Sequence, residues 1–217
     1  MKGLLLKDLF MSKAYCRVYL LISSVFMVLY AYSTVSAIPG ASGNLFFLLY
    51  PTVLASMVPV NLLAYESQCK WETYAGTLPY TRAQIVSGKY LVGLVFFGVL
   101  LVLSLTVQAI AMVIAGVFSL GILVNQGLLM LLCFFASCTF VLPLIFRFGV
   151  EKGRIFYMLI IGLLCGLTAA IGFITKGSLS ASDWVFPKAL ALTLAASMAL
   201  YLGSWLLSIR LYEKREF

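Results

Sequence analysis

The side chains best suited to specific binding chemistry gather in one polar stretch, residues 65–90, which reads YESQCKWETYAGTLPYTRAQIVSGKY. Trp and Tyr are favoured at protein interfaces, and on a helix Trp71 and Tyr74 share one face while Glu66 and Lys70 share another. Because a bilayer interior offers polar groups no hydrogen-bond partner, the stretch must lie in water or against another protein. The chemistry that its residues indicate is therefore that of docking.

Two sets of helix signals divide this polar stretch into a hairpin. Gly76 ends a first short helix, and Thr81 begins a second as its N-cap, with Gln84 three residues later completing a capping box. Pro79 keeps the residue before it extended, so the turn between the helices is angular. We expect a rigid protrusion that contacts a partner. The alternative, a solvated hairpin without a partner, leaves Trp71 exposed for no reason.

Catalytic and metal chemistry have little support in the residue types. The chain has no histidine, which excludes Ser-His hydrolases and zinc or haem sites built on imidazole. None of the five cysteines forms a Cys-x-x-Cys pair. The Gly88-Lys89 pair is no P-loop, because Ala83 stands where that motif needs its first glycine and Tyr90 where it needs Ser or Thr. We expect a chain that is not an enzyme and that binds neither metal nor nucleotide.

The composition is that of a membrane protein, with 63% hydrophobic and 10% charged residues and a mean hydropathy of +1.08. A soluble domain is about one quarter charged. Six apolar runs are long enough to cross a bilayer as helices, over about residues 18–38, 45–64, 91–118, 122–146, 155–175 and 189–209. We predict an all-α, polytopic membrane protein with one transmembrane domain over residues 1–217. A water-soluble bundle would need polar outer faces that these runs lack.

Charge divides the connections between the runs into two classes. Of the 15 Lys and Arg residues, all but Lys176 and Lys188 fall in the N-terminal segment, the second and fourth connections and the C-terminal tail. Because positive charge is retained in the cytoplasm, both termini are predicted to be cytoplasmic. The same distribution explains the net charge of +8. It leaves no basic face on a folded domain, so no nucleic-acid partner is expected.

The N-terminal segment, residues 1–17, has its own pattern. Leu5, Leu6, Leu9 and Phe10 recur at near-helical spacing opposite the lysines. This predicts a helix that lies in the membrane interface, with its lysines reaching the lipid headgroups. The alternative is an ordinary basic anchor before the first span.

Three features within the runs bear on packing. Pro51 and Pro59 each remove a backbone donor from the second run, which is therefore expected to be bent or locally unwound. The fifth run carries small residues four apart, Gly162, Gly166 and Ala170, which allow another helix to approach closely, within the subunit or across a dimer. No charged residue lies in the middle of any run, which argues against an ion-coupled pump.

The chain as a whole resembles a known family. The start Lys-Gly-Leu-Leu-Leu-Lys-Asp, the six runs, and the polar stretch from Trp71 through Thr77-Leu-Pro79 and Arg82 to Lys89-Tyr90 resemble permeases of the type-2 ABC exporter class. The resemblance is greatest to small bacterial permeases such as that of the phenol-soluble modulin exporter. It implies a multi-pass protein of the bacterial cell (inner) membrane.

In that class, the polar stretch after the second span is a coupling helix that seats in a groove of a separate cytoplasmic ATP-binding subunit. The resemblance implies two such subunits and two permeases, either a homodimer or a pair of similar permeases. ATP and Mg would bind to the partner, with no cofactor in this chain. Spans one and five would form the dimer seam, which agrees with the ridge of small residues. The implied partner contacts are Glu66, Lys70, Trp71, Glu72, Tyr74, Leu78 and Arg82.

The expected function is that of a permease subunit in an ATP-driven exporter. The spans offer apolar and aromatic surface without buried charge, which favours amphipathic or antimicrobial-type peptides as cargo. The residues expected to line the path are Tyr30, Phe46, Phe47, Tyr50, Pro51, Pro59 and Asn61. The aromatic residues among them would equally suit a lipid-facing surface. Two other functions stay open: a non-transporting immunity or sensor subunit that docks through the same stretch, and an ABC permease that exports a lipid or drug.

Overall fold

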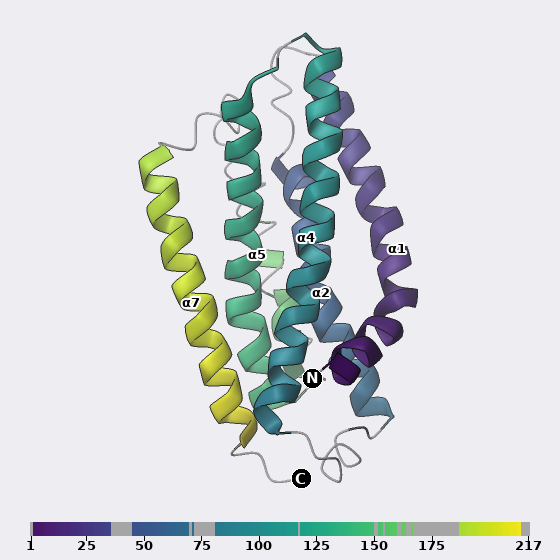
Figure 1. The fold of residues 1–217 in the computed structure, drawn as a ribbon, viewed down its shortest axis with the longest axis vertical. Helices are drawn as coiled ribbons and strands as arrows, with labels where there is room; N and C mark the ends of the chain where they lie inside the picture. The colour runs from purple at the N-terminus through teal and green to yellow at the C-terminus, as the bar shows by residue number, and fades with distance from the viewer. Residues whose placement is uncertain are drawn as a thin grey trace.

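The computed structural model describes residues 2–35, 45–69, 71, 81–116, 118–149, 152–153, 155–159, 162–163, 166 and 187–213. These residues include no strand and form five long helices: α1 (Lys2–Val35), α2 (Leu45–Gln68), α4 (Arg82–Ile114), α5 (Leu120–Phe148) and α7 (Pro187–Glu213). The helices lie lengthwise beside one another in an elongated bundle (Figure 1). The all-α prediction is confirmed for this part of the chain.

Each of the five helices contains a stretch long and apolar enough to cross a membrane: Tyr15–Tyr32, Phe47–Gln68, Arg82–Ile114, Leu120–Arg147 and Leu194–Tyr212. These stretches agree with five of the six predicted runs. The sixth, over residues 155–175, lies mostly outside the described residues, so the count of six spans stays a prediction. In its described part, Tyr157 is buried and its hydroxyl donates a hydrogen bond to Val53 O at 3.0 Å.

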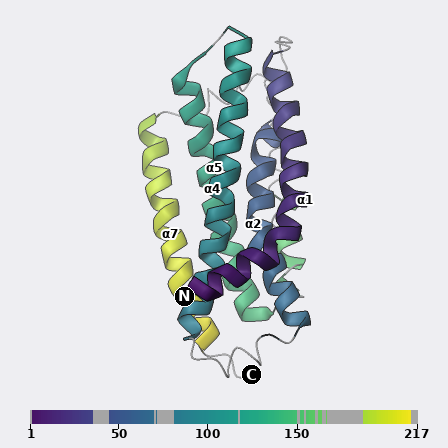
Figure 2. The ribbon, with the colours of Figure 1, turned by 45° about the vertical axis from the view of Figure 1, so that its right-hand side comes forward.

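α1 continues without a break from the N-terminal segment into the first span. Its first turns cross the end of the bundle at an angle, and the helix then turns to run along the bundle (Figure 2). In these turns Leu4, Asp8 and Ser12 are buried, while Leu6 and Phe10 are 59% and 66% exposed on the opposite face. The exposed apolar face suits an interfacial helix, although its place in a membrane interface stays a prediction.

α2 stays helical through both of its prolines, so the expected local unwinding does not occur. Pro51 and Pro59 are both buried. Pro59 faces Gly93 of α4, where a Cβ atom would lie only 3.3 Å from Pro59 Cγ. The missing side chain of Gly93 therefore lets the proline ring settle against α4 and brings the two helices together.

α4 is the central helix of the described bundle and contacts α1, α2, α5 and α7. Against α5, the ring of Phe97 stacks on that of Phe134 with centroids 4.1 Å apart. Against α7, the hydroxyl of Tyr90 lies 2.7 Å from Ser208 Oγ. α4 thus links the other four described helices to one another.

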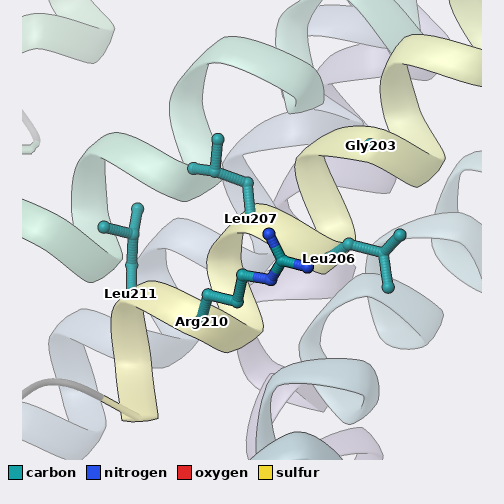
Figure 3. Close-up of a pocket in the computed structure, with 5 residues that line it drawn as sticks. All are labelled: Gly203, Leu206, Leu207, Arg210 and Leu211. Atoms are coloured by element: carbon teal, nitrogen blue, oxygen red, sulfur yellow. The ribbon is translucent and has the colours of Figure 1, made fainter.

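α7 lies along one side of the bundle and has two unlike faces. Its inward face carries the buried residues Ser204 and Ser208, which contact α4. Its outward face bears a shallow hollow of about 370 Å³. Figure 3 shows the residues that line the hollow: Gly203, Leu206, Leu207, Arg210 and Leu211.

Candidate functional site

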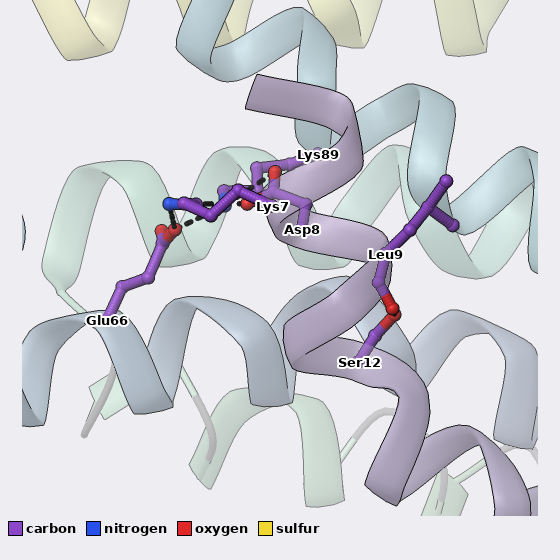
Figure 4. Close-up of polar contacts among 6 residues, drawn as sticks. All are labelled: Lys7, Asp8, Leu9, Ser12, Glu66 and Lys89. Carbon is purple, nitrogen blue, oxygen red and sulfur yellow. Dashed lines mark hydrogen bonds and ion pairs between the residues drawn. The ribbon is translucent and has the colours of Figure 1, made fainter. Parts of the chain in front are cut away.

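Four charged side chains from three helices meet near the start of α4 (Figure 4). Lys89 Nζ of α4 lies 2.9 Å from Asp8 Oδ2 of α1 and 2.7 Å from Glu66 Oε1 of α2. Lys7 Nζ lies 2.6 Å from the same Glu66 oxygen and 3.3 Å from Asp8 Oδ1. Two ammonium groups thus balance two carboxylates, and we call these four residues the ionic cluster.

The ionic cluster is largely removed from water. Asp8 is 0% exposed, Lys89 1% and Glu66 3%, and only the Lys7 side chain, at 24%, reaches the surface. Moving an ion from water into a protein interior costs several kcal/mol, which close pairing offsets. Removing one partner leaves an uncompensated buried charge, at a cost of about 3–5 kcal/mol. The ionic cluster therefore fixes α1, α2 and α4 to one another.

A glycine makes room for this arrangement. A Cβ atom on Gly88 would lie 3.0 Å from Leu4 Cδ2 and 3.7 Å from Asp8 Oδ2. Its absence lets α1 approach the first turns of α4 closely enough for Asp8 to pair with Lys89. Beside the pair, Leu4 and Ile85 form a small buried apolar contact.

The ionic cluster touches the predicted docking element through Trp71. Lys7 Nζ lies 3.7 Å from the centre of the Trp71 ring, within the range of a cation–π interaction. Trp71 also packs against the contact between Leu4 and Ile85. The residue is half-buried and so less exposed than its place in a polar stretch suggested. At least this part of the docking element rests on α1.

The other predicted partner contacts lie in different surroundings. Glu66 is buried in the ionic cluster, and its contact with a partner stays a prediction. Arg82 is exposed, and its Nη1 donates a hydrogen bond to Tyr212 O of α7 at 3.3 Å. Contact with a partner stays a prediction for the residues that lie outside the described part: Lys70, Glu72, Tyr74 and Leu78.

The predicted start of α4 is confirmed. Gln84 N lies 3.4 Å from Thr81 Oγ1, and Thr81 N lies 3.3 Å from Gln84 Oε1, which are the two hydrogen bonds of a capping box. Thr81 itself has extended backbone angles, and helical geometry begins at Arg82. Because the capping box fixes where the helix begins, it also fixes the direction in which Lys89 points, two turns later.

The charge pattern alone does not reveal the ionic cluster. Basic residues near the end of a span are usually interpreted as marking the cytoplasmic side of the membrane, and not as ion-pair partners. A usable signal exists nevertheless. Lys89 falls in the buried stripe of α4 between Ile85 and Phe96, and Asp8 shares the buried face of α1 with Leu4. A charged residue in an apolar stripe is almost never fully buried unless it is paired. Two such residues of opposite sign predict each other as partners.

Three of the predicted path residues gather at one small cavity. Tyr30, Phe47 and Pro51 line it with Met27, Leu48, Ser104 and Gln108, and its volume is about 10 Å³. That volume is close to what a single water molecule needs, so this cavity is not an open passage in the present conformation. Gln126 Nε2 of α5 donates a hydrogen bond to the Tyr30 hydroxyl at 3.0 Å, a contact that the sequence did not single out.

The remaining predicted path residues do not share that cavity. Tyr50 stacks on Phe26 with ring centroids 3.9 Å apart, and the amide of Asn61 donates a hydrogen bond to the Tyr19 hydroxyl. The side chain of Phe46 lies outside the described part of the chain. The set therefore lines no single surface in this conformation, and its role in a path stays a prediction.

Gly162 and Gly166 lie on an outward face of the predicted fifth span. No described atom lies within 4 Å of a Cβ built at either glycine, and the neighbouring Leu159 and Leu163 are each 64% exposed. The two glycines thus do not pack inside the described part of the subunit. Ala170 lies outside the described residues, and the dimer seam stays a prediction.

Comparison with known proteins agrees with this arrangement. The sequence model of the ABC-2 family transporter proteins matches residues 3–213, a range that takes in nearly all of the five described helices. No curated protein sequence matches the chain. The chain therefore belongs to the ABC-2 transporter family and is a multi-pass membrane protein, the permease component of an ABC transporter.

Proposed function

We propose that this chain is the permease subunit of an ABC exporter, driven by a separate cytoplasmic subunit that binds ATP and Mg. The observation that carries the proposal is the ionic cluster with Trp71 beside it, because these residues tie α1, α2 and α4 to the polar stretch that would dock. Membership of the ABC-2 family implies an ATP-binding partner in general. The particular contact through residues 65–90 is our inference.

The ionic cluster suits the transmission of movement. Glu66 stands near the end of α2 and Lys89 in the first turns of α4, so force on the residues between them acts on both helices. Separating buried opposite charges costs several kcal/mol, so these helix ends move together with α1 instead of sliding past it. Closure of the ATP-binding subunits would then rock the three helices as a unit and expose the cargo path on the outer side.

The orientation follows from the distribution of charge. The first turns of α1, the end of α2, the start of α4 and the end of α7 lie toward one end of the bundle (Figures 1 and 2). The segments that flank this end hold most of the 15 basic residues, with Lys176 and Lys188 as the exceptions. Under the positive-inside rule, this end faces the cytoplasm of a bacterial cell and both termini are inside.

The proposed transporter contains two permease copies. Gly162 and Gly166 carry no side chain and have open space at their Cβ positions, so the helix of a second copy can approach their backbone closely. We assign this face to the seam of a homodimer, or of a dimer with a similar permease.

The proposed cargo is an amphipathic peptide. The described residues around the small cavity are apolar, aromatic or neutral and polar, and none of them is charged. A path that opened between these helices would offer apolar surface with Ser104 and Gln108 as hydrogen-bonding groups. Such a lining suits a molecule with one apolar face and a backbone that needs hydrogen-bond partners.

Docking is tested with the full chain and a candidate ABC ATP-binding subunit from the same organism. Trp71→Ala combined with Tyr74→Ala is expected to lower copurification of the two subunits and the permease-stimulated rate of ATP hydrolysis. Phe118→Ala is the matched control, since Phe118 is a 55% exposed aromatic residue between α4 and α5. Normal assembly and normal stimulated hydrolysis in the double variant would refute docking through this stretch.

Cargo is tested separately in inside-out proteoliposomes that hold both subunits. ATP-dependent uptake of a fluorescent amphipathic peptide is the expected result. Uptake of a lipid or drug probe instead of the peptide would keep the exporter and replace its cargo. Normal assembly without uptake of any of the three probes would favour the immunity or sensor role.

A further inference from the structure

The outward face of α7 combines a hollow with a lone basic group. Gly203, Leu207 and Arg210 follow one another at helical spacing, so they stack along one side of the helix. No described atom lies within 4 Å of a Cβ built on Gly203, while Leu206 and Leu207 are 56% and 51% exposed. The hollow is thus open and apolar along its length, and Arg210 stands toward its C-terminal end.

Arg210 is turned toward this apolar surface. Figure 3 shows its side chain folded back along α7 toward Leu206 and Leu207. Helical side chains tilt toward the helix N-terminus, so an arginine in the last turn reaches back over the preceding one. Arg210 lies near the C-terminal end of the apolar stretch Leu194–Tyr212, so this direction leads from the helix end toward the middle of that stretch.

The guanidinium of Arg210 has no acidic partner among the described residues. Asp8 and Glu66 both belong to the ionic cluster, and the side chain of Glu213, three residues beyond Arg210 in α7, lies outside the described part of the chain. A guanidinium stays charged and presents five hydrogen-bond donors in a planar fork. Near hydrocarbon such a group needs an anion that can accept several of these donors.

We propose that this hollow binds a phospholipid with a net anionic headgroup. The lipid phosphate accepts paired hydrogen bonds from Arg210, and an acyl chain lies over Gly203 between the exposed leucines. The predicted orientation supports this occupant, because the end of α7 then faces the cytoplasmic leaflet, which holds anionic lipids. The Arg fork matches a phosphate oxygen pair. The inference is independent of the cargo and of the ATP-binding subunit.

The test measures lipids retained by the purified full-length chain in native mass spectrometry after addition of equal amounts of phosphatidylglycerol and phosphatidylcholine. The wild-type chain is expected to retain more phosphatidylglycerol. Arg210→Gln should lower its retention about fivefold, since one basic residue near an anionic surface contributes about 1 kcal/mol. Lys188→Gln, which removes a basic residue at the opposite end of α7, is the matched control and should have little effect.

A second variant fills the hollow without a change of charge. Gly203→Leu should also lower phosphatidylglycerol retention, whereas Gly98→Leu in α4, where a Cβ likewise meets no described atom within 4 Å, should not. Unchanged retention in Arg210→Gln or in Gly203→Leu would overturn the proposal. Equal retention of both lipids by the wild-type chain would also overturn it. So would conversion of a dimer to a monomer by Gly203→Leu, because the hollow would then be a subunit seam.

Discussion

Lys89 Nζ of α4 lies 2.7 Å from Glu66 Oε1 of α2, and this ion pair joins the two ends of the polar stretch that runs between them. The proposed docking element therefore begins and ends at one buried contact. Because the ion pair holds the end of α2 and the start of α4 together, force on the docking element would reach both helices. Asp8 and Lys7 add α1 to the same base.

Removal of the central cation is expected to destabilise the chain strongly. Lys89→Met should lower the free energy of unfolding by about 3–5 kcal/mol, because Asp8 and Glu66 stay buried with Lys7 as their remaining partner. Denaturant-driven unfolding of the purified chain in detergent measures the change. Lys13→Met, at an exposed residue, should stay within about 0.5 kcal/mol of wild type. Equal stability of the two variants would mean that Lys89 is not held as described.

A double-mutant cycle separates charge imbalance from lost packing. Glu66→Gln alone removes one carboxylate charge, and combined with Lys89→Met it restores the balance of the ionic cluster. We expect the double variant to be more stable than the sum of the two single effects, with a coupling of about 0.5–3 kcal/mol. Strict additivity would show that the two side chains do not interact, against the 2.7 Å contact.

The close approach at Gly88 gives a second prediction. Gly88→Val should cost about 1–3 kcal/mol, since the new Cβ would meet Leu4 Cδ2 at 3.0 Å and its methyl groups would push α1 from α4. Gly98→Val in the same helix meets no described atom within 4 Å at its Cβ and serves as the control. The same unfolding measurement applies. A Gly88 variant as stable as the Gly98 variant would show that α1 lies elsewhere.

Local chemistry explains which features the sequence could predict. The start of α4 depends on Thr81 and Gln84, three residues apart, and both hydrogen bonds of their capping box are formed. The apolar runs likewise carry their own signal for length, and five of them coincide with described helices. The capping box depends on residues only three apart, and each apolar run depends on its own contact with lipid. Neither depends on a contact with a distant part of the chain.

The partners of buried polar groups were not predicted, because they lie far apart in the sequence. The burial of Lys89 depends on Asp8, which precedes it by 81 residues, and the contact of Gln126 with Tyr30 spans 96 residues. A single sequence shows that Glu66 is charged. It does not show which face of α2 packs against another helix, because that depends on how the bundle assembles. The sequence prediction for this reason did not include the pairing of Glu66 with Lys89.

The predicted topology is tested by labelling of single cysteines in a background without the five native ones. Ser180→Cys should react with a membrane-impermeant thiol reagent added to intact cells. Thr73→Cys should react only after permeabilisation, because residues 65–90 are expected in the cytoplasm. Labelling in the opposite order would reverse the orientation and place the polar stretch out of reach of an ATP-binding subunit.

The predicted dimer seam is tested at the outward glycines. Gly166→Leu should lower the yield of crosslinks between single cysteines on the fifth span of two copies, because a bulky side chain keeps the backbones apart and lipid adds no opposing hydrophobic penalty. Gly121→Leu, near the start of α5, is the control and should leave the yield unchanged. An unchanged yield in Gly166→Leu would place the seam elsewhere.

The pairing of Asp8 with Lys89 also has a consequence for biosynthesis. Asp8 leaves the ribosome 81 residues ahead of Lys89, which at 5–20 residues per second is a delay of roughly 4–16 s. During that time the carboxylate has no Lys89 to neutralise it and stays hydrated, so the first turns of α1 remain at the membrane surface. They settle onto α4 only after its first turns have been made. Asp8 is thus made well before the residue that neutralises it, and its turn of α1 reaches its final position only after that residue has been made.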